Sequence, residues 1–344
     1  MADQATIPPK MKAVLQPDKT SHNLISSEIT VPIPTHPEDV LVRVHATSPC
    51  KGELDWALWA PEFIGPDKTP IPGQDLAGTV VSAPCTSSFK TGDRVYARIN
   101  ANRPGCAAEY VLARESELAI KPKNLNWVET AATPISALTG YQGLFTQGTL
   151  DKLALKGDNA ALEKNAKQRV LITGASGGGV GSWAVQLARE AGVKNIIAVV
   201  GERNVDYVKE LGASETIAYT KQTIGDWVKE DQNGREVDLV FDCAGGSSLA
   251  ASWYAVKDGG KFVSVCGVPE DSRPKDVKKT VQSLWFVITP LGKDLDIITE
   301  MVEAGRLKVN IDSVFEFDQF SAAFEKTETG RPRGKVILKV SGEV

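Results

Sequence analysis

The spacing of apolar residues divides the chain into two regions with different predicted elements. Up to about Lys121, short apolar or alternating runs such as Lys12–Leu15, Val40–His45 and Leu76–Val81 are separated by turns that contain glycine and proline. Runs of this kind predict strands. Strands that follow one another so closely favour a small twisted barrel or sandwich, so the first region is expected to be rich in β-structure.

From Arg169 onward the pattern of apolar residues changes, and apolar strands alternate with amphipathic helices. The predicted strands are Val170–Thr173, Ile196–Val200, Thr216–Ala218, Val237–Asp242 and Phe262–Val265. Such alternation predicts a parallel sheet that is covered by helices on both faces. The segment Thr146–Gln168 between the two regions is polar and lysine-rich, and we expect a loop there with at most one exposed helical turn.

Composition and charge exclude several classes of protein. With 42% hydrophobic and 24% charged residues, the chain of 344 residues has the composition of a globular protein, not of a disordered one. The net charge is −4 and no long basic run occurs, so a nucleic-acid partner is not expected. The number of cysteines is odd and no Cys-x-x-Cys pair occurs, which argues against a disulfide framework. Without an apolar signal segment or a run long enough to span a membrane, we expect a cytoplasmic protein.

The strongest local motif is a glycine-rich loop that leaves the strand Val170–Thr173 and enters the next helix. It consists of Gly174, Ala175, Ser176, Gly177, Gly178, Gly179, Val180 and Gly181. In a dinucleotide fingerprint, glycines let the chain turn sharply, let the backbone approach a diphosphate, and let the helix pack closely on the strand. The N–H groups at the start of the helix would then bind the phosphates.

The end of the second strand of this region bears on the choice between NAD and NADPH. An NAD site places a carboxylate there for the ribose 2′-hydroxyl, whereas this chain has Val200 and Gly201, followed by Glu202 and Arg203. A guanidinium group suits a 2′-phosphate. Glu202 could instead serve the ribose, and the two charged residues could also form a solvated surface pair. The pattern favours NADPH.

On these and further motifs the chain resembles the medium-chain dehydrogenase/reductase superfamily, and in particular its zinc-free, quinone-oxidoreductase-like branch. The further motifs are Ala132-Thr133-Pro134, Phe241-Asp242-Cys243-Ala244-Gly245 and Gly330-Arg331-Pro332-Arg333-Gly334-Lys335-Val336. The resemblance implies an α/β protein with a Rossmann doubly wound parallel sheet and a GroES-like β-barrel catalytic domain. Residues 1–138 would form the catalytic domain, residues 139–290 the cofactor domain, and residues 291–344 a return segment that completes the first. It also implies a homodimer and an active site in the cleft between the two domains.

The resemblance further implies which residues contact the cofactor outside the glycine loop. These are Thr139, Tyr219, Cys243, Ala244, Gly245, Cys266, Gly267, Val268, Phe286 and Val287. In relatives a tyrosine at the place of Tyr219 lies near the 2′-phosphoadenosine, which strengthens the prediction of NADPH.

No metal site is expected. Zinc-dependent relatives carry Gly-His-Glu where this chain reads Gly73-Gln74-Asp75, and glutamine is a poor zinc ligand. Cys50 stands near another ligand position of those relatives, and we interpret it as a small buried residue. Without a Lewis acid, we expect hydride transfer to a polarised acceptor, either a quinone or an α,β-unsaturated carbonyl compound. A dedicated enoyl or double-bond reductase of a biosynthetic pathway and a non-catalytic NADPH-binding protein remain alternatives.

The residues that would contact the acceptor are less well defined. Cys50, Trp56, Trp59 and Phe63 could wall a flat apolar pocket, or the aromatic side chains could be ordinary packing. Lys51 and Tyr141 are candidates for the proton donor. Lys51 could equally be a surface charge and Tyr141 a packed helix residue, and solvent could also supply the proton.

Overall fold

The computed structural model describes residues 7–62, 64, 69–176 and 179–342 of the chain. The chain forms two compact units. Unit 1 comprises Met1–Ile135 and Thr289–Val344, and unit 2 comprises Ser136–Ile288.

Unit 1 is built on strands that pair antiparallel, apart from the last two strands of the chain, which pair in parallel, and most of them belong to one seven-stranded sheet. The strands are β1 (Lys10–Leu15), β2 (Ile25–Thr30), β3 (Asp39–Thr47), β4 (Asp75–Ser82), β5 (Arg94–Arg98), β6 (Tyr110–Arg114), β7 (Ala119–Ile120), β14 (Ile311–Phe315) and β15 (Lys335–Lys339). The sheet has the order β14-β15-β3-β4-β5-β7, with β6 also paired to β3, while β1 and β2 form a separate hairpin. The last strand of the chain thus pairs with β3, and Leu338 lies opposite Thr47.

The alternating apolar residues of these strands fill the interior of unit 1. One buried cluster gathers Val40, Val42, Val44, Leu76, Val80, Val95, Ala97, Val111 and Ala113 from β3, β4, β5 and β6. The helices of unit 1 are α1 (Trp56–Trp59), α2 (Trp127–Ala131), α10 (Gly292–Glu303) and α11 (Phe320–Glu328), with 3₁₀ turns at Glu53–Asp55, Glu115–Glu117 and Phe317–Gln319. The hydroxyl of Tyr96 on β5 donates to the carbonyl of Leu295 at 2.9 Å, which ties α10 to the sheet.

Unit 2 contains the predicted parallel sheet. Its strands are β8 (Arg169–Thr173), β9 (Asn195–Val200), β10 (Glu215–Ala218), β11 (Val237–Asp242), β12 (Val256–Ser264) and β13 (Gln282–Trp285). The order is β10-β9-β8-β11-β12-β13, so the chain winds outward from β8 and then returns to the other side of it. This is the doubly wound arrangement that strand–helix alternation predicts, and its topological switch point lies between β8 and β11.

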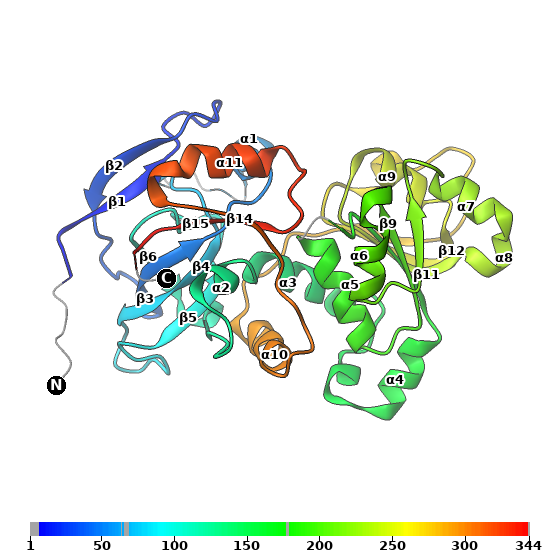
Figure 1. Cartoon of the computed structure of the whole chain (residues 1–344), viewed down its shortest axis with the longest axis horizontal. Coiled ribbons are helices and arrows are strands. Elements are labelled where there is room, and N and C mark those ends of the chain that lie inside the picture. Colours follow the sequence, from blue (N-terminus) through cyan, green and yellow to red (C-terminus); the bar gives the residue numbers. More distant parts are fainter. Residues whose placement is uncertain (1–6, 63, 65–68, 177–178, 343–344) are drawn as a thin grey trace. The chain divides into compact units, whose positions relative to one another are not determined.

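Helices cover both faces of this sheet. They are α3 (Pro134–Tyr141, which begins at the end of unit 1), α4 (Asn159–Ala166), α5 (Val180–Glu190), α6 (Val205–Leu211), α7 (Ile224–Glu230), α8 (Gln232–Arg235) and α9 (Gly246–Ser252), with a π-helical turn at Gln142–Thr146 and 3₁₀ turns at Lys152–Lys156, Glu202–Asn204 and Pro269–Ser272. Side chains of α7 and α9 share one buried cluster with Leu171 and Val240 of the sheet. Helices α5 and α6 lie side by side in unit 2 (Figure 1). No helix of the described residues is long and apolar enough to cross a membrane.

The segment Thr146–Gln168 differs from the prediction of a loop. It forms the 3₁₀ turn Lys152–Lys156 and helix α4. The Asp158 carboxylate accepts a hydrogen bond from the N–H of Ala161 at 2.8 Å and caps this helix. The buried Asn165 amide donates to the carbonyls of Asp151 and Ala191 and so fixes the helix to its surroundings. Polar contacts rather than an apolar stripe stabilise α4, which is why the hydrophobic pattern missed it.

Candidate cofactor and active site

The glycine-rich turn joins β8 to α5 within unit 2. Gly174 has a φ of +61°, in the left-handed region that favours glycine. A Cβ atom on Gly181 would lie 2.4 Å from the Gly174 carbonyl oxygen, which is too close for any side chain. The turn therefore needs glycine at both places, as a dinucleotide fingerprint does. Gly177 and Gly178 of the predicted site lie outside the described residues.

Helix α5 begins at Val180, with Gly179 as its N-cap. Among the described residues no side chain caps this end, and the first N–H groups of any helix lack partners within the helix. A diphosphate would satisfy these donors and would benefit from the positive end of the helix dipole. The hydroxyl of Ser176 accepts a hydrogen bond from the Asn204 amide at 3.0 Å, which ties the loop to the segment after β9. Ala175 of the loop is fully buried.

The structure brings Arg203 and Tyr219 to neighbouring strand ends. Strands β9 and β10 are parallel, with Val200 opposite Ala218, and the N–H of Tyr219 donates to the Val200 carbonyl at 3.0 Å. The Tyr219 side chain is 62% exposed and lies against Gly201, where a Cβ would be 3.2 Å from the phenol oxygen. Arg203 is exposed in the 3₁₀ turn that follows Gly201.

An ion pair that sequence reasoning missed lies beside these residues. The Lys221 ammonium pairs with the Glu202 carboxylate, and both side chains are more than half exposed. Lys221 follows β10 closely, just as Glu202 follows β9. The two strand ends therefore carry two cations, one anion and a phenol, and the negative charge of Glu202 is balanced by Lys221.

On the other side of β8, the Asp242 carboxylate organises the ends of three strands. It accepts hydrogen bonds from the hydroxyls of Thr173 on β8 at 2.6 Å and Ser264 on β12 at 3.0 Å. These hydroxyls in turn accept the backbone N–H groups of Cys243 at 2.9 Å and Cys266 at 3.0 Å. The network fixes the backbone at two of the predicted cofactor-contacting segments, although Asp242 itself was not predicted as a site residue.

The remaining predicted cofactor-contacting residues lie as follows. Gly245 and Gly267 have positive φ values of 70° and 153°. The exposed residues are Ala244, Val268 and Val287. Phe286 is half-buried, and its N–H donates to the Ser264 carbonyl at 3.1 Å. Thr139 is 5% exposed in α3. The segments after β11, β12 and β13 thus come together at the carboxyl ends of adjacent parallel strands, where ligands bind in such sheets.

The predicted acceptor-binding residues lie in unit 1. Trp56 is half-buried in α1, and Trp59 is 70% exposed with its ring against Gly52. Burial raises the pKa of the half-buried Cys50 thiol to about 12, so this thiol is protonated at neutral pH. Phe63 lies outside the described residues.

The place of a zinc ligand is occupied by a buried ion pair. The Asp75 carboxylate accepts the N–H of Ile135 at 2.6 Å and lies 3.1 Å from the Lys335 ammonium. Gln74 beside it is 2% exposed. Among the described residues, no three histidine, cysteine, aspartate or glutamate side chains are grouped so that they could hold a metal ion. Lys335 is the first residue of β15 and directly precedes the apolar run Val336–Leu338. A lysine at the start of such a buried strand is the signal that could have marked it.

The two candidates for the proton donor differ in their surroundings. Lys51 is exposed, and its Nζ lies beside Gly330, where a Cβ would be 2.8 Å away. Tyr141 is 1% exposed, and its ring packs against Phe145 with 5.1 Å between the centroids. Lys51 thus lies at the surface of unit 1 and Tyr141 in the interior of unit 2, and their role as donors stays a prediction.

Comparison with known proteins identifies the family. Residues 36–123 match the family described as alcohol dehydrogenase GroES-like domain, and residues 211–338 match zinc-binding dehydrogenase. A probable zinc-binding oxidoreductase, mitochondrial, from Arthroderma benhamiae is 42% identical over 342 residues, which are 99% of this chain and 100% of the relative. The chain belongs to the medium-chain dehydrogenase/reductase superfamily, in its quinone-oxidoreductase-like branch.

A second relative in this superfamily is the NADPH-dependent alkenal/one oxidoreductase, chloroplastic, from Arabidopsis thaliana. It is 29% identical over 97% of this chain and 81% of its own length. The quinone oxidoreductase structure from Coxiella burnetii superposes with a TM-score of 0.79 over 96% of this chain and 100% of that chain, at 24% identity. The predicted fold, a Rossmann sheet with a GroES-like barrel, is confirmed. As a member of the superfamily, the chain is an oxidoreductase with a nicotinamide cofactor.

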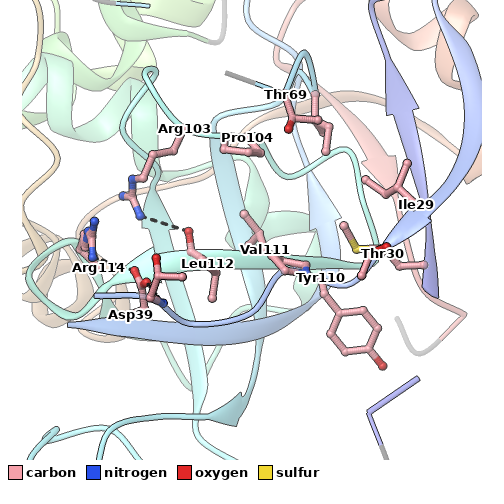
Figure 2. Close-up of a pocket in the computed structure, with 14 residues that line it drawn as sticks. Ile29, Thr30, Asp39, Thr69, Arg103, Pro104, Tyr110, Val111, Leu112 and Arg114 are labelled. Atoms are coloured by element: carbon pink, nitrogen blue, oxygen red, sulfur yellow. Dashed lines mark hydrogen bonds and ion pairs between the residues drawn. The ribbon is translucent and has the colours of Figure 1, made fainter. Parts of the chain in front are cut away.

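A pocket in unit 1 contains none of the predicted site residues. It has a volume of about 200 Å³ and is lined by residues of β1, β2, β6 and nearby loops (Figure 2). Its charged groups are satisfied internally, because Arg114 pairs with Asp39 at 2.7 Å and Arg103 donates to the Leu112 carbonyl at 3.2 Å. We therefore assign it no part in this oxidoreductase's chemistry.

Proposed function

We propose that the chain is an NADPH-dependent, zinc-independent reductase that transfers a hydride to a quinone or an α,β-unsaturated carbonyl compound. The observation that carries the proposal is the pair of strand ends at β9 and β10. Arg203, Lys221 and Tyr219 follow these adjacent strands, with a glycine rather than a carboxylate directly after β9. A 2′-phosphate needs cations and hydrogen-bond donors at this place.

The residues present fit a bound dinucleotide. A Cβ on Gly174 or Gly181 would lie 3.0 Å or 2.4 Å from a backbone carbonyl oxygen, and the first N–H groups of α5 are available to a diphosphate. When bound, the nicotinamide supplies the hydride. The hydrogen-bond network of Asp242 would hold the segments after β11 and β12 in place so that they orient the ring. The aromatic side chains Trp56 and Trp59 would offer a flat apolar surface to the acceptor.

Zinc independence is supported by the surroundings of Asp75. Its carboxylate oxygens already interact with the Ile135 N–H and the Lys335 ammonium. A cation at this place would have to displace a buried lysine, and the neighbouring Gln74 is a poor zinc ligand. Metal analysis of the purified protein tests this, and we expect less than stoichiometric zinc and unchanged turnover after treatment with a chelator.

Cofactor titration tests the assignment of NADPH. Replacing Arg203 with alanine should weaken NADPH binding about tenfold or more, because a charge-assisted hydrogen bond to phosphate contributes about 1.5–3 kcal/mol, and NADH binding should change little. Lys209→Ala, which removes an exposed cation from α6 in the same unit, is the matched control and should leave both affinities unchanged. An equal loss for NADPH and NADH in Arg203→Ala would contradict the assignment.

Steady-state oxidation of NADPH with a panel of quinones and enones tests the reaction. Turnover with several acceptors supports the proposal. Turnover with a single acceptor would favour a dedicated enoyl or double-bond reductase, and tight NADPH binding without turnover would favour a non-catalytic NADPH-binding protein.

Assembly and location complete the proposal. We propose a homodimer, because β13 is an edge strand of the sheet and exposes Trp285, with Val287 just beyond it. Light scattering of the purified protein tests this. We also propose a cytoplasmic location, and since the Arthroderma relative is named a mitochondrial protein, cell fractionation should decide between the two compartments.

A further inference from the structure

Two cysteines lie at the carboxyl ends of neighbouring strands in unit 2. Cys243 directly follows β11, and Cys266 comes shortly after β12. The two strands are parallel, with Asp242 opposite Ser264. Because paired strands run about 4.7–4.9 Å apart, the register brings the backbones of the two cysteines close to the separation of about 4.4–6.8 Å that a disulfide requires.

The Cys266 side chain also lies close to the segment that carries Cys243. Gly245 has no side chain, and a Cβ there would lie 2.9 Å from the Cβ and 4.0 Å from the Sγ of Cys266. The Cys266 side chain therefore lies on the backbone that leads directly from Cys243. Burial raises the pKa of the Cys243 thiol, and the electrostatic influence of the neighbouring Cys266 raises it further.

The shared hydrogen-bond network holds this arrangement. The N–H of Cys243 donates to Thr173, the N–H of Cys266 donates to Ser264, and both hydroxyls donate to the one carboxylate of Asp242. Both backbones are thus anchored to a single buried group. In the structure neither cysteine forms a disulfide, and Cys266 is exposed whereas Cys243 is half-buried.

We propose that Cys243 and Cys266 form a redox-sensitive modification site, in which a peroxide oxidises the two thiols to an intramolecular disulfide. The Cys266 thiolate, as the exposed group, attacks one peroxide oxygen. The O–O bond breaks, water or an alcohol leaves, and Cys266 becomes a sulfenic acid. The Cys243 sulfur then attacks the Cys266 sulfur, forms the S–S bond and expels the hydroxyl group as water. Two thiols lose two protons and two electrons in total, and the peroxide is reduced by the same two electrons.

The disulfide would act on the cofactor site, and this consequence rests on the proposed function. The carbonyl of Cys243 lies 3.0 Å from the place of a Cβ on Gly174, so the segment after β11 packs against the glycine-rich turn. Joining this segment to the one after β12 closes the space that the resemblance assigns to the nicotinamide. Oxidation should therefore weaken NADPH binding about tenfold or more, and a dithiol reductant should restore it.

Peptide mapping of the full chain after treatment with hydrogen peroxide tests the proposal without reference to activity. Trypsin should release the segments 236–257 and 262–275, each with one of the two cysteines. We expect these peptides to be joined under non-reducing conditions, with the mass of the pair lower by two hydrogen atoms. NADPH affinity is then measured on the same sample before oxidation, after oxidation, and after reduction with dithiothreitol.

Three variants complete the experiment. In Cys266→Ser and Cys243→Ser, peroxide should produce no joined peptides and should not change each variant's own NADPH affinity. Cys85→Ser, which removes an exposed thiol in unit 1, should behave like the wild-type protein. The proposal is overturned if the wild-type peptides stay separate, or if NADPH binds equally well to the disulfide form. Failure of the reduced wild-type protein to bind NADPH would instead refute the proposed function. The peptide map would still show whether the disulfide between Cys243 and Cys266 forms.

Discussion

The Nζ atom of Lys335 on β15 lies 3.1 Å from the Asp75 carboxylate on β4, and the two side chains are 9% and 0% exposed. Burial is the largest influence and disfavours the ammonium form of Lys335, but the charge and hydrogen bond of Asp75, together with Cys50 and Glu53, outweigh it and raise the pKa of Lys335. Burial also raises the pKa of the Asp75 carboxyl, while Lys335 lowers it. The pair joins the last strand of the chain to an early one.

Replacing Asp75 with asparagine should destabilise unit 1. The Lys335 ammonium would stay buried without a counter-charge, and breaking a buried pair in this way costs about 3–5 kcal/mol. Urea unfolding followed by tryptophan fluorescence measures the change. The control is Asp226→Asn, which breaks the exposed pair of Asp226 with Lys229 in unit 2 and should not alter the unfolding curve. Equal stability of the two variants would show that the Asp75 pair contributes nothing.

Replacing Glu202 with glutamine should strengthen NADPH binding. The change removes an anion beside the proposed 2′-phosphate and releases Lys221 from its ion pair. Since exposed pairs contribute about 0.2–1 kcal/mol, we expect a gain of about two- to fivefold for NADPH, which should shrink as the salt concentration rises. NADH affinity is the internal comparison and should stay the same, as should both affinities in Glu210→Gln on α6. A parallel gain for NADH would mean that Glu202 does not act on the 2′-phosphate.

Replacing Gly181 with alanine should disrupt the glycine-rich turn. The new Cβ would lie 2.4 Å from a backbone carbonyl oxygen that cannot move without shifting β8 or α5. Overpacking of this kind costs about 1–3 kcal/mol, and dinucleotide binding should be lost with it. Gly225→Ala in α7 is the matched control, because its Cβ would meet no atom closer than the Tyr254 ring at 3.5 Å, which is ordinary van der Waals contact. Thermal unfolding and NADPH titration of both variants check the prediction, and normal binding by Gly181→Ala would refute it.

A pH-dependent contact is expected at His22. Its Nε2 lies 2.8 Å from the Asp55 carboxylate, and this hydrogen bond raises the pKa of His22 above its ordinary value. The contact therefore stabilises the fold below a pH of about 6.5, and the contribution disappears as the pH rises through the raised pKa. The effect on stability should be small, since the imidazole is 49% exposed. A titration followed by NMR should give a higher pKa for His22 in the wild-type protein than in Asp55→Asn, and equal values would exclude the contact.

Local patterns made much of this fold predictable. The alternation of strands and helices after Arg169 predicts the doubly wound sheet, and the glycines between Gly174 and Gly181 predict the turn, because each depends on residues close together in the sequence. The Asp75–Lys335 and Glu202–Lys221 pairs were not predicted, because each joins residues on different elements whose pairing only the folded chain determines. Helix α4 was missed for a different reason: a capping aspartate and a buried asparagine fix it, and neither produces a hydrophobic pattern.

The pairing of β15 with β3 has a consequence for how the protein is made. The hydroxyl of Ser48, just after β3, donates to the Val336 carbonyl on β15 at 2.8 Å, and the central sheet of unit 1 includes β15 between β14 and β3. During translation the ribosome has synthesised all of unit 2 before it reaches this strand, and domains generally fold as they emerge. The sheet of unit 1 therefore stays incomplete, with an unpaired edge, until β15 has been synthesised. This is the period in which a chaperone would be most needed to prevent misassociation of the nascent chain.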